Sequence, residues 1–341
     1  MPPFDHPPPV SPAPVYHGGD LGWAMAQFPD APKPWLDLST GINPWPYALP
    51  PLAPNAWARL PSEAMLRRLC TAAARYYGAG DPNCVVAAPG SQALIQWLPR
   101  LRKTSQVAVL GPTYGEHAPC WIAAGHDVDV CARLDDIAAG VNVVVLGNPN
   151  NPDGRIFAAN TLIALADRMA SRGGWIVVDE AFADTAPALS IVRRATDPGC
   201  VVLRSFGKFF GLAGLRLGFL LAAPALAGEV RAALGPWAVS GPAAEIGARA
   251  LSDAAWIEAT RSRIGAAARK LEASLAQSGA KIVGGTGLFC LIEHRAAPRV
   301  FEALCRSGIF VRRFAERPDW LRIGLPPDDA ALIRLQEALG A

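Results

Sequence analysis

The sequence contains only five lysines, and one of them lies in a markedly apolar setting. Lys208 sits in the run Phe-Gly-Lys-Phe-Phe, whereas the other four lie beside proline, arginine or residues typical of a helix surface. Apolar surroundings disfavour the charged ammonium and lower its pKa. A neutral amine can attack a carbonyl and form a Schiff base, which arginine cannot do because its guanidinium stays charged. A buried lysine is rare without a role, so Lys208 is the first candidate for catalysis.

Other polar residues stand where predicted strands end. Ligands of open α/β sheets bind at the carboxyl ends of the strands, so these residues are expected to meet. They offer a helix start able to bind an anion, an aromatic ring, amides, a carboxylate and an amine. In chain order they are Ser91-Gln92, Thr113-Tyr114, the run from Asn148 to Gly154 that contains Asn151, Asp179-Glu180, and Ser205 to Lys208, with Arg216 eight residues further on.

The elements that must position these residues follow from hydrophobic periodicity. Apolar runs predict strands at 84–88, 107–110, 127–130, 141–147, 175–179, 200–205 and 216–222. Helices are predicted at 62–77, 91–102, 115–124, 160–172 and 187–195. This alternation favours βα units, hence an α/β fold with a mostly parallel sheet and helices on both faces. A long helix over about 242–278, strands near Lys281, Phe289 and Arg322, and helices near 298–307 and 327–339 predict a smaller α+β unit.

The first part of the chain is rich in proline. Half of the 32 prolines lie in residues 1–61, which excludes a regular helix or a central strand there. The same stretch holds Trp23, Trp35, Trp45 and Trp57. We therefore expect residues 1–14 to be a loose tail and 15–61 an extended arm on an apolar surface of this chain or of a second subunit. The expected division is 1–61 tail and arm, 62–235 large domain and 236–341 small C-terminal domain.

Composition excludes several other classes of protein. A net charge of +3, with no basic run longer than two residues, gives no sign of nucleic-acid binding. Seven cysteines without a Cys-x-x-Cys pair predict neither a disulfide framework nor a metal site. The apolar run 209–228 is broken by Arg216, Pro224 and glycines, so no membrane span is expected. The N-terminus lacks the features of a signal peptide, and we expect a cytoplasmic protein.

Each motif also has a simpler interpretation. Small residues at a helix start usually only cap it. Val-Val-Asp179-Glu180 is similar to the acidic strand of P-loop ATPases, but the Gly-x-x-x-x-Gly-Lys-[Ser/Thr] run that those proteins need is absent. The glycines at 207, 211, 214 and 218 do not form a Gly-x-Gly-x-x-Gly fingerprint, so a dinucleotide site is not supported.

The motifs resemble, in order and spacing, the fold type I pyridoxal-phosphate enzymes of the class I/II aminotransferase family. The resemblance runs from about residue 16 to the C-terminus. It is carried by Asn151-Pro-x-Gly, Asp179-Glu-Ala and Ser205-x-x-Lys208 followed by Arg216. It implies the fold of that family, pyridoxal 5'-phosphate as cofactor, and a homodimer with its sites at the subunit interface.

The resemblance assigns three catalytic residues. Lys208 would form the Schiff base with the cofactor. Asp179 would pair with the protonated ring nitrogen, and Tyr114 would stack on the ring face. Asn151 would hydrogen-bond the ring's 3'-oxygen. Many relatives have a tyrosine where this chain has Phe182, so Asn151 would be the main protein donor to that oxygen.

The cofactor phosphate would be held by four further residues. The backbone of Ser91 and Gln92 would bind it at a helix start, together with the side chains of Ser205 and Arg216. The arm reads Arg-Leu60-Pro where relatives often read Arg-Tyr-Pro, so a tyrosine that would reach the neighbouring subunit's phosphate is missing.

Further motifs resemble one branch of the family, the threonine-phosphate decarboxylases of cobalamin biosynthesis. They are His17-Gly-Gly-Asp, Thr-Gly41-Ile-Asn-Pro, Pro-Gly-Ser-Gln-Ala-Leu-Ile-Gln and Val-Arg-Arg313-Phe. These enzymes remove carbon dioxide from L-threonine O-3-phosphate and form (R)-1-amino-2-propanol O-2-phosphate. The resemblance implies that Arg322 binds the substrate carboxylate, with help from the Gly41 backbone and Asn151. It places His17 and Arg313 at the substrate phosphate.

Two alternatives remain open at this point. An aminotransferase of the histidinol-phosphate type would use the same lysine and cofactor, because loss of a carboxylate or of a hydrogen is decided by geometry that single residues barely encode. A non-catalytic relative would be expected to lack Lys208.

Overall fold

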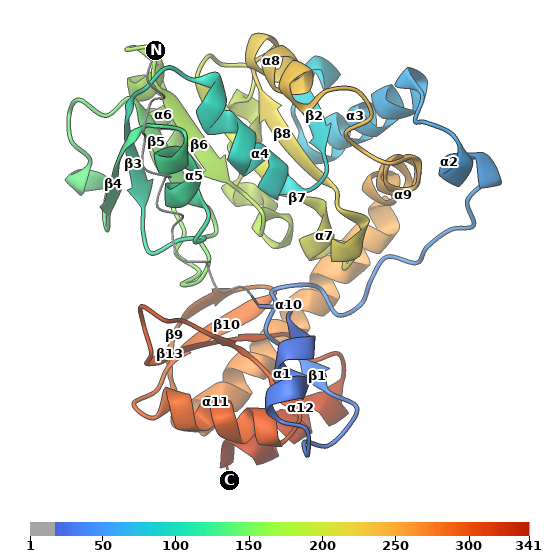
Figure 1. Cartoon of the computed structure of the whole chain (residues 1–341), viewed down its shortest axis with the longest axis vertical. Helices are drawn as coiled ribbons and strands as arrows, with labels where there is room; N and C mark the ends of the chain where they lie inside the picture. The colour runs from blue at the N-terminus through green and yellow to red at the C-terminus, as the bar shows by residue number, and fades with distance from the viewer. Residues whose placement is uncertain (1–17, 341) are drawn as a thin grey trace, which may run out of the picture.

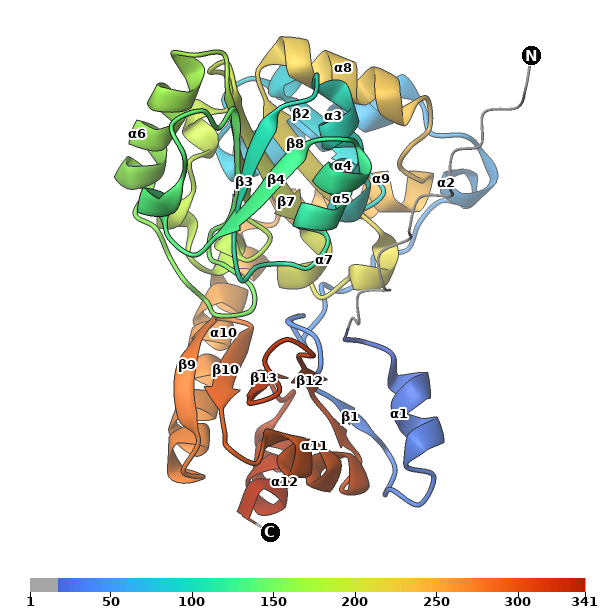
Figure 2. The same ribbon diagram turned by 60° about the vertical axis from the view of Figure 1, so that its left-hand side comes forward.

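The large part of the molecule is a seven-stranded sheet with helices on both faces. A computed structural model describes residues 18–340 (Figures 1 and 2). The strand order is β2-β8-β7-β6-β5-β3-β4, and only β8 runs antiparallel to its neighbours. The strands are β2 (Val85–Ala88), β3 (Gln106–Leu110), β4 (Asp127–Cys131), β5 (Val143–Gly147), β6 (Trp175–Asp179), β7 (Cys200–Ser205) and β8 (Gly218–Ala222). The α/β prediction is confirmed.

Alternate side chains of the strands feed two separate cores. Val144 and Leu146 belong to one apolar cluster, and Val143 and Val145 to the other, because successive residues of a strand point to opposite faces. The first cluster includes α3 (Glu63–Tyr77), α6 (Ala159–Ala170) and α9 (Gly241–Ser252). The second includes α4 (Ser91–Trp97), α5 (His117–Ala123) and α8 (Pro224–Leu234). Continuous apolar strands are therefore explained by burial on both faces.

A smaller antiparallel sheet lies below the large one in Figure 1. Its order is β12-β13-β10-β9, with β9 (Lys281–Thr286), β10 (Phe289–Glu293), β12 (Arg312–Arg313) and β13 (Trp320–Gly324). The helices α10 (Ala254–Gln277), α11 (Ala297–Arg306) and α12 (Asp329–Gly340) accompany it, and α10 extends between the two sheets (Figure 1). The three-part division of the chain stays a prediction.

The arm is more regular than its prolines predicted. It forms α1 (Leu21–Gln27), β1 (Leu36–Asp37) and α2 (Pro54–Ala58). Asp20 starts α1 because its carboxylate accepts the N–H of Trp23 at 3.0 Å. β1 pairs in parallel with β11 (Ile309–Phe310) in a separate two-stranded sheet, and the Leu38 carbonyl accepts the N–H of Gly324 in β13 at 2.8 Å, so the first half of the arm is joined to the C-terminal part.

Two predicted helices are corrected. The long helix over 242–278 is two helices, because the Asp253 carboxylate accepts the N–H of Trp256 at 3.0 Å and caps α10. The segment 187–195 forms two short 3-10 turns, Pro187–Leu189 and Val192–Arg194, instead of an α-helix. Here the Glu180 carboxylate accepts the Ser190 hydroxyl at 2.6 Å and the Ile191 N–H at 2.8 Å, which competes with helical hydrogen bonding.

A buried ion cluster ties the ends of β6 and β7 together. Arg204 lies 2.9 Å from the Glu180 carboxylate and 3.6 Å from that of Asp184, and all three side chains are buried. The guanidinium also stacks on the Tyr77 ring, 4.6 Å from its centroid. Glu180 directly follows Asp179 and Arg204 directly precedes Ser205, so this cluster fixes the backbone on which the polar strand ends are carried. No helix within residues 18–340 has the length and apolar character needed to cross a membrane.

Candidate active site

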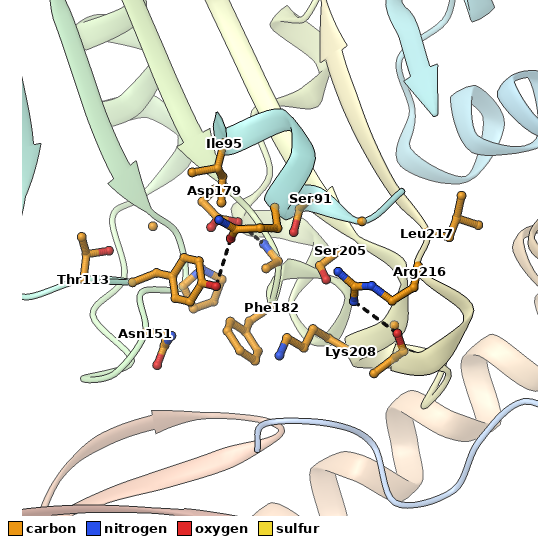
Figure 3. Close-up of a pocket in the computed structure, with 18 residues that line it drawn as sticks. Ser91, Ile95, Thr113, Asn151, Asp179, Phe182, Ser205, Lys208, Arg216 and Leu217 are labelled. Carbon is orange, nitrogen blue, oxygen red and sulfur yellow. Dashed lines mark hydrogen bonds between the residues drawn. The ribbon is translucent and has the colours of Figure 1, made fainter. Parts of the chain in front are cut away.

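The polar strand ends meet in one cavity at the edge of the large sheet that faces the small sheet. Figure 3 shows Asp179, Ser205, Lys208 and Arg216 around it, above strands of the small sheet. The cavity is lined by Gly90, Ser91, Gln92, Ile95, Thr113, Tyr114, Gly147, Pro149, Asn151, Asp179, Ala181, Phe182, Ser205, Gly207, Lys208, Ala213, Arg216 and Leu217. All eight residues that the resemblance assigned to the cofactor are among them.

One end of the cavity is shaped for an anion. Gly90 precedes α4 in a left-handed conformation with φ of 87°, and the first N–H groups of α4 follow it. The Arg216 guanidinium lies so close that a Cβ at Gly90 would be 2.7 Å from its Nη2. Ser205 lies in the same wall. Free N–H groups, a hydroxyl and a guanidinium are the donors that a phosphate prefers, so these residues fit the cofactor phosphate.

Asp179 lies at the opposite side of the cavity, held by two hydrogen bonds. Its Oδ1 accepts the Ala181 N–H at 3.1 Å, and its Oδ2 lies 3.1 Å from Nε2 of His117. Both side chains are buried. This contact fixes the orientation of the carboxylate from the side away from the cavity's other polar groups. The sequence analysis did not identify His117, although it lies three residues after Tyr114 at the start of α5.

The aromatic ring of Tyr114 is fixed by a chain of hydrogen bonds. Its hydroxyl donates to Gln92 Oε1 at 3.0 Å, and the Gln92 amide donates to Glu116 at 3.3 Å. Burial, with the charges of Glu116 and Asp179, raises the pKa of the Tyr114 hydroxyl to about 12. The phenol therefore stays protonated and acts here as a fixed donor.

Lys208 is carried by α7 (Phe206–Phe209), directly after β7. It is partly buried, and its Nζ lies 5.7 Å from the centroid of the Phe182 ring (Figure 3). Burial, together with the charges of Arg322 and Arg216, lowers the pKa of the Lys208 amine to about 8, against the opposing effect of Asp179. The expectation from its apolar neighbours was a lowered pKa, and the structure adds two cations as a second cause.

Arg322 reaches the cavity from β13 of the small sheet. It is buried, its Nη1 donates to Asn151 Oδ1, and its Nη2 donates to the Ser39 carbonyl at 2.9 Å. Its guanidinium stacks on Phe289, 4.9 Å from the ring centroid. Burial and the charge of Arg312 lower the pKa of Arg322 to about 9, which leaves it charged at neutral pH. The structure thus brings together Arg322 and Asn151.

Gly41 completes the wall beside Phe182. A Cβ at this position would lie 2.8 Å from a carbon of the Phe289 ring and 2.9 Å from one of the Phe182 ring. The two rings meet edge to face, with centroids 5.1 Å apart. Gly41 belongs to the arm, Phe182 follows β6 of the large sheet, and Phe289 belongs to β10 of the small sheet. Only glycine fits where these three segments converge.

The structure does not bring Arg313 to the cavity. Its guanidinium stacks on Trp23 and Phe301, 5.2 and 5.0 Å from their ring centroids, outside the face that carries Arg322. Arg312, instead, pairs directly opposite Arg322, and opposed residues share a face of a sheet. Of this Arg-Arg pair, Arg312 therefore shares the sheet face of Arg322, and the place of Arg313 at the substrate phosphate stays a prediction. His17 lies outside the described residues.

Comparisons with known proteins agree with this geometry. The family described as aminotransferase class I and II matches residues 47–339. A protein of Sinorhizobium sp. named threonine-phosphate decarboxylase is 46% identical over 96% of this chain and 98% of its own. One of Pseudomonas aeruginosa with the same name is 44% identical over 95% and 96%. The solved histidinol-phosphate aminotransferase of Sinorhizobium meliloti, in complex with pyridoxal-5'-phosphate, has a TM-score of 0.77 at 21% identity and covers 99% and 97% of the chains.

The lowered pKa of Lys208 predicts how cofactor-free protein reacts with an aldehyde. Only the neutral amine attacks, so the rate of labelling Lys208 with pyridoxal phosphate and borohydride should rise with pH up to about 8 and then level off. At pH 7 about a tenth of the amine is neutral, compared with about one part in 2,500 for an ordinary lysine of pKa 10.4. Peptide mapping by mass spectrometry measures the rate, with a lysine peptide as control. A rate that keeps rising beyond pH 10 would contradict the assignment.

Proposed function

The chain belongs to the class I and II aminotransferase family, and from this we propose that it is a pyridoxal-phosphate-dependent decarboxylase. Its substrate is L-threonine O-3-phosphate, its product is (R)-1-amino-2-propanol O-2-phosphate, and its place is cobalamin biosynthesis. The observation that carries this proposal is the identity of 46% and 44%, over nearly the whole chain, with two proteins named threonine-phosphate decarboxylase. The alternative, a histidinol-phosphate-type aminotransferase, is named only by more distant relatives such as the solved structure at 21% identity.

The residues of the cavity fit pyridoxal 5'-phosphate. When bound, the cofactor supplies an electron-withdrawing ring that weakens the bonds at the substrate's Cα. Asp179, with His117 behind it, is placed to keep the ring nitrogen protonated. Tyr114 presents its ring face, Asn151 an amide, and Lys208 the amine that bonds the cofactor and exchanges a proton with the substrate.

The phosphate of the cofactor belongs at the other end of the cavity. Ser91 and Gln92 offer the backbone of the α4 start, and Ser205 and Arg216 offer side chains. This end is fixed because the buried Arg204 cluster holds the backbone directly before Ser205.

The two anionic ends of the substrate need two cationic groups. We assign the carboxylate to Arg322, beside Asn151 and Gly41, and the substrate phosphate to Arg312 on the same face of the small sheet. His17, for which the structure gives no position, keeps its proposed place at that phosphate. Whether the substrate loses its carboxylate or its Cα hydrogen depends on how it is oriented in the site. These cations set that orientation.

We further propose a cytoplasmic homodimer. The arm between β1 and α3 exposes Leu49, Trp57 and Leu60, whose exposed fractions of 64%, 70% and 66% are high for large apolar side chains. Exposed apolar residues of this kind are typical of a surface covered by a partner, and a second copy fits the family. The seven cysteines are all free, which suits a reducing compartment.

Stoichiometry tests the reaction. Purified enzyme loaded with cofactor should release one carbon dioxide per L-threonine O-3-phosphate without any oxo-acid acceptor, measured by coupled carbon dioxide detection and by the phosphorylated amine formed. Lys208→Arg should abolish turnover, because its guanidinium cannot serve as the amine. Turnover that requires 2-oxoglutarate would refute decarboxylation and support the aminotransferase.

Adjacent arginines test the substrate phosphate site. Arg312→Met should raise KM for L-threonine O-3-phosphate by about tenfold or more, since a hydrogen bond to a charged group contributes about 1.5–3 kcal/mol. Arg313→Met is the matched control, and its KM should stay within about twofold because Arg313 stacks on Trp23 and Phe301 away from the cavity. A larger effect at Arg313 would reverse the assignment.

The dimer can be tested by measuring the mass of the protein in solution and by substituting an exposed tryptophan of the arm. Sedimentation velocity of the full chain should give about twice the 36.0 kDa of one copy. Trp57→Asp should shift the equilibrium toward the monomer, since burying an unpaired carboxylate at an interface is costly. A wild-type protein that stays monomeric at micromolar concentration would rule the dimer out.

A further inference from the structure

The loop from Asn148 to Arg155 is anchored rigidly to the large sheet. The Arg155 guanidinium donates to the carbonyls of Ala132 at 2.7 Å and Gly111 at 3.1 Å, beside the ends of β4 and β3. Within the loop, Asp153 Oδ1 accepts the Asn150 amide at 2.7 Å and the Arg155 N–H at 3.0 Å. Asn151, which lies in the active site, is therefore held on a loop with little freedom.

Strand β9 and this loop approach each other backbone to backbone at Gly284 and Gly154. A Cβ on Gly284 would lie 2.1 Å from the Asp153 carbonyl oxygen, and a Cβ on Gly154 would lie 2.0 Å from that of Gly285. Real Cβ contacts essentially never fall below 3.0 Å, so neither position accepts a side chain. Gly154 also has a φ of +69°, which favours glycine by itself. Gly284 has no such φ, and its only close contact is Asp153, so the approach of β9 to the loop is what requires glycine there.

Gly284 and Arg322 lie in one row across the small sheet. Leu291 of β10 pairs with Gly284 on one side and with Arg322 on the other. Residues directly opposed in this way share a face, and two strand spacings place Gly284 and Arg322 about 10 Å apart. This face meets the anchored loop at two points, Gly284 against Asp153 and Arg322 against Asn151.

We propose that Gly284 is a positioning residue of the active site: its backbone contact with Asp153 sets how closely the small sheet approaches the loop, and so aligns Arg322 with Asn151. The inference rests on the proposed function, in which Arg322 receives the substrate carboxylate. A methyl group at 284 forces the two backbones apart by about 1 Å, the difference between 2.1 Å and an acceptable 3.0 Å. Displacements of that size in a positioning group can cost up to about a hundredfold in rate.

Gly284→Ala tests the proposal, with Gly228→Ala as the matched control. Gly228 lies in α8 and a Cβ there meets open space. In the loaded enzyme, Gly284→Ala should lower kcat/KM for L-threonine O-3-phosphate by about tenfold or more, mainly through KM. Gly228→Ala should leave both constants unchanged. A Gly284→Ala enzyme with wild-type constants and a wild-type Tm would overturn the proposal.

A double-mutant cycle separates positioning from general damage to the fold. If Gly284 acts through the contact between Arg322 and Asn151, Gly284→Ala should have little effect in an Asn151→Ala enzyme, where that contact is already lost. In that background it should weaken substrate binding by less than about twofold. Substrate binding is followed by the change it causes in the cofactor's visible absorption. If the effects of the two substitutions on the free energy of substrate binding add fully, the proposal is contradicted. If Gly284→Ala does not fold, Gly154→Ala enters the same contact from the loop. Gly173→Ala, at a similar φ of +66° but with open space at its Cβ, controls for the backbone strain.

One measurement does not depend on the substrate. Asn151 borders the cofactor ring, so the pH titration of the visible absorption of the loaded enzyme reports its position. The titration midpoint should shift in Gly284→Ala and not in Gly228→Ala. If wild-type enzyme releases no carbon dioxide, the proposed function fails, while this shift still supports the positioning role and its absence refutes it.

Discussion

The structure depends on one electrostatic constraint, which is to make a useful fraction of the Lys208 amine neutral near neutral pH inside a cavity that must also hold anions. Burial removes water from the ammonium, and the nearby guanidinium charges of Arg322 and Arg216 oppose a further positive charge. Arg322 itself stays protonated, because even its lowered pKa of about 9 lies above neutral pH. The same two arginines therefore have two effects: they favour the neutral amine, and they attract the negatively charged groups of cofactor and substrate.

That constraint explains why three distant parts of the chain converge. Arg322 cannot remain buried and charged without acceptors, and it finds them in Asn151 of the large sheet and in the Ser39 carbonyl of the arm. The arm in turn pairs with β11 through β1, and its Leu38 carbonyl accepts the N–H of Gly324 in β13. The contact between Arg322 and Asn151 beside the cavity therefore requires the arm and both sheets to be in place.

Much of the fold and of the cofactor site follows from the sequence, because both depend on local patterns. Apolar runs define the strands, and the rule that ligands gather at carboxyl ends brings Asp179, Ser205 and Lys208 together before any coordinates are known. What fails depends on contacts between residues that are apart in the sequence. The segment 187–195 is not helical because Glu180, ten residues upstream of Ser190, accepts hydrogen bonds from its donors. His117 could not be identified from the sequence for a similar reason, because the residues around it do not indicate that it contacts Asp179.

The backbone contact between β9 and the loop at Asp153 also restricts how such an enzyme could change during evolution. Because backbone meets backbone at Gly284 and Gly154, there is no side chain here whose size could be varied. Substitution therefore cannot adjust this contact, the joint between β9 and the loop, in small steps. The wall formed by Gly41, Phe182 and Phe289 is different, because its shape depends on side chains drawn from three segments. New substrate preferences would therefore have to arise by remodelling the wall while the joint stays as it is, which separates the part of the site that can diversify from the part that cannot.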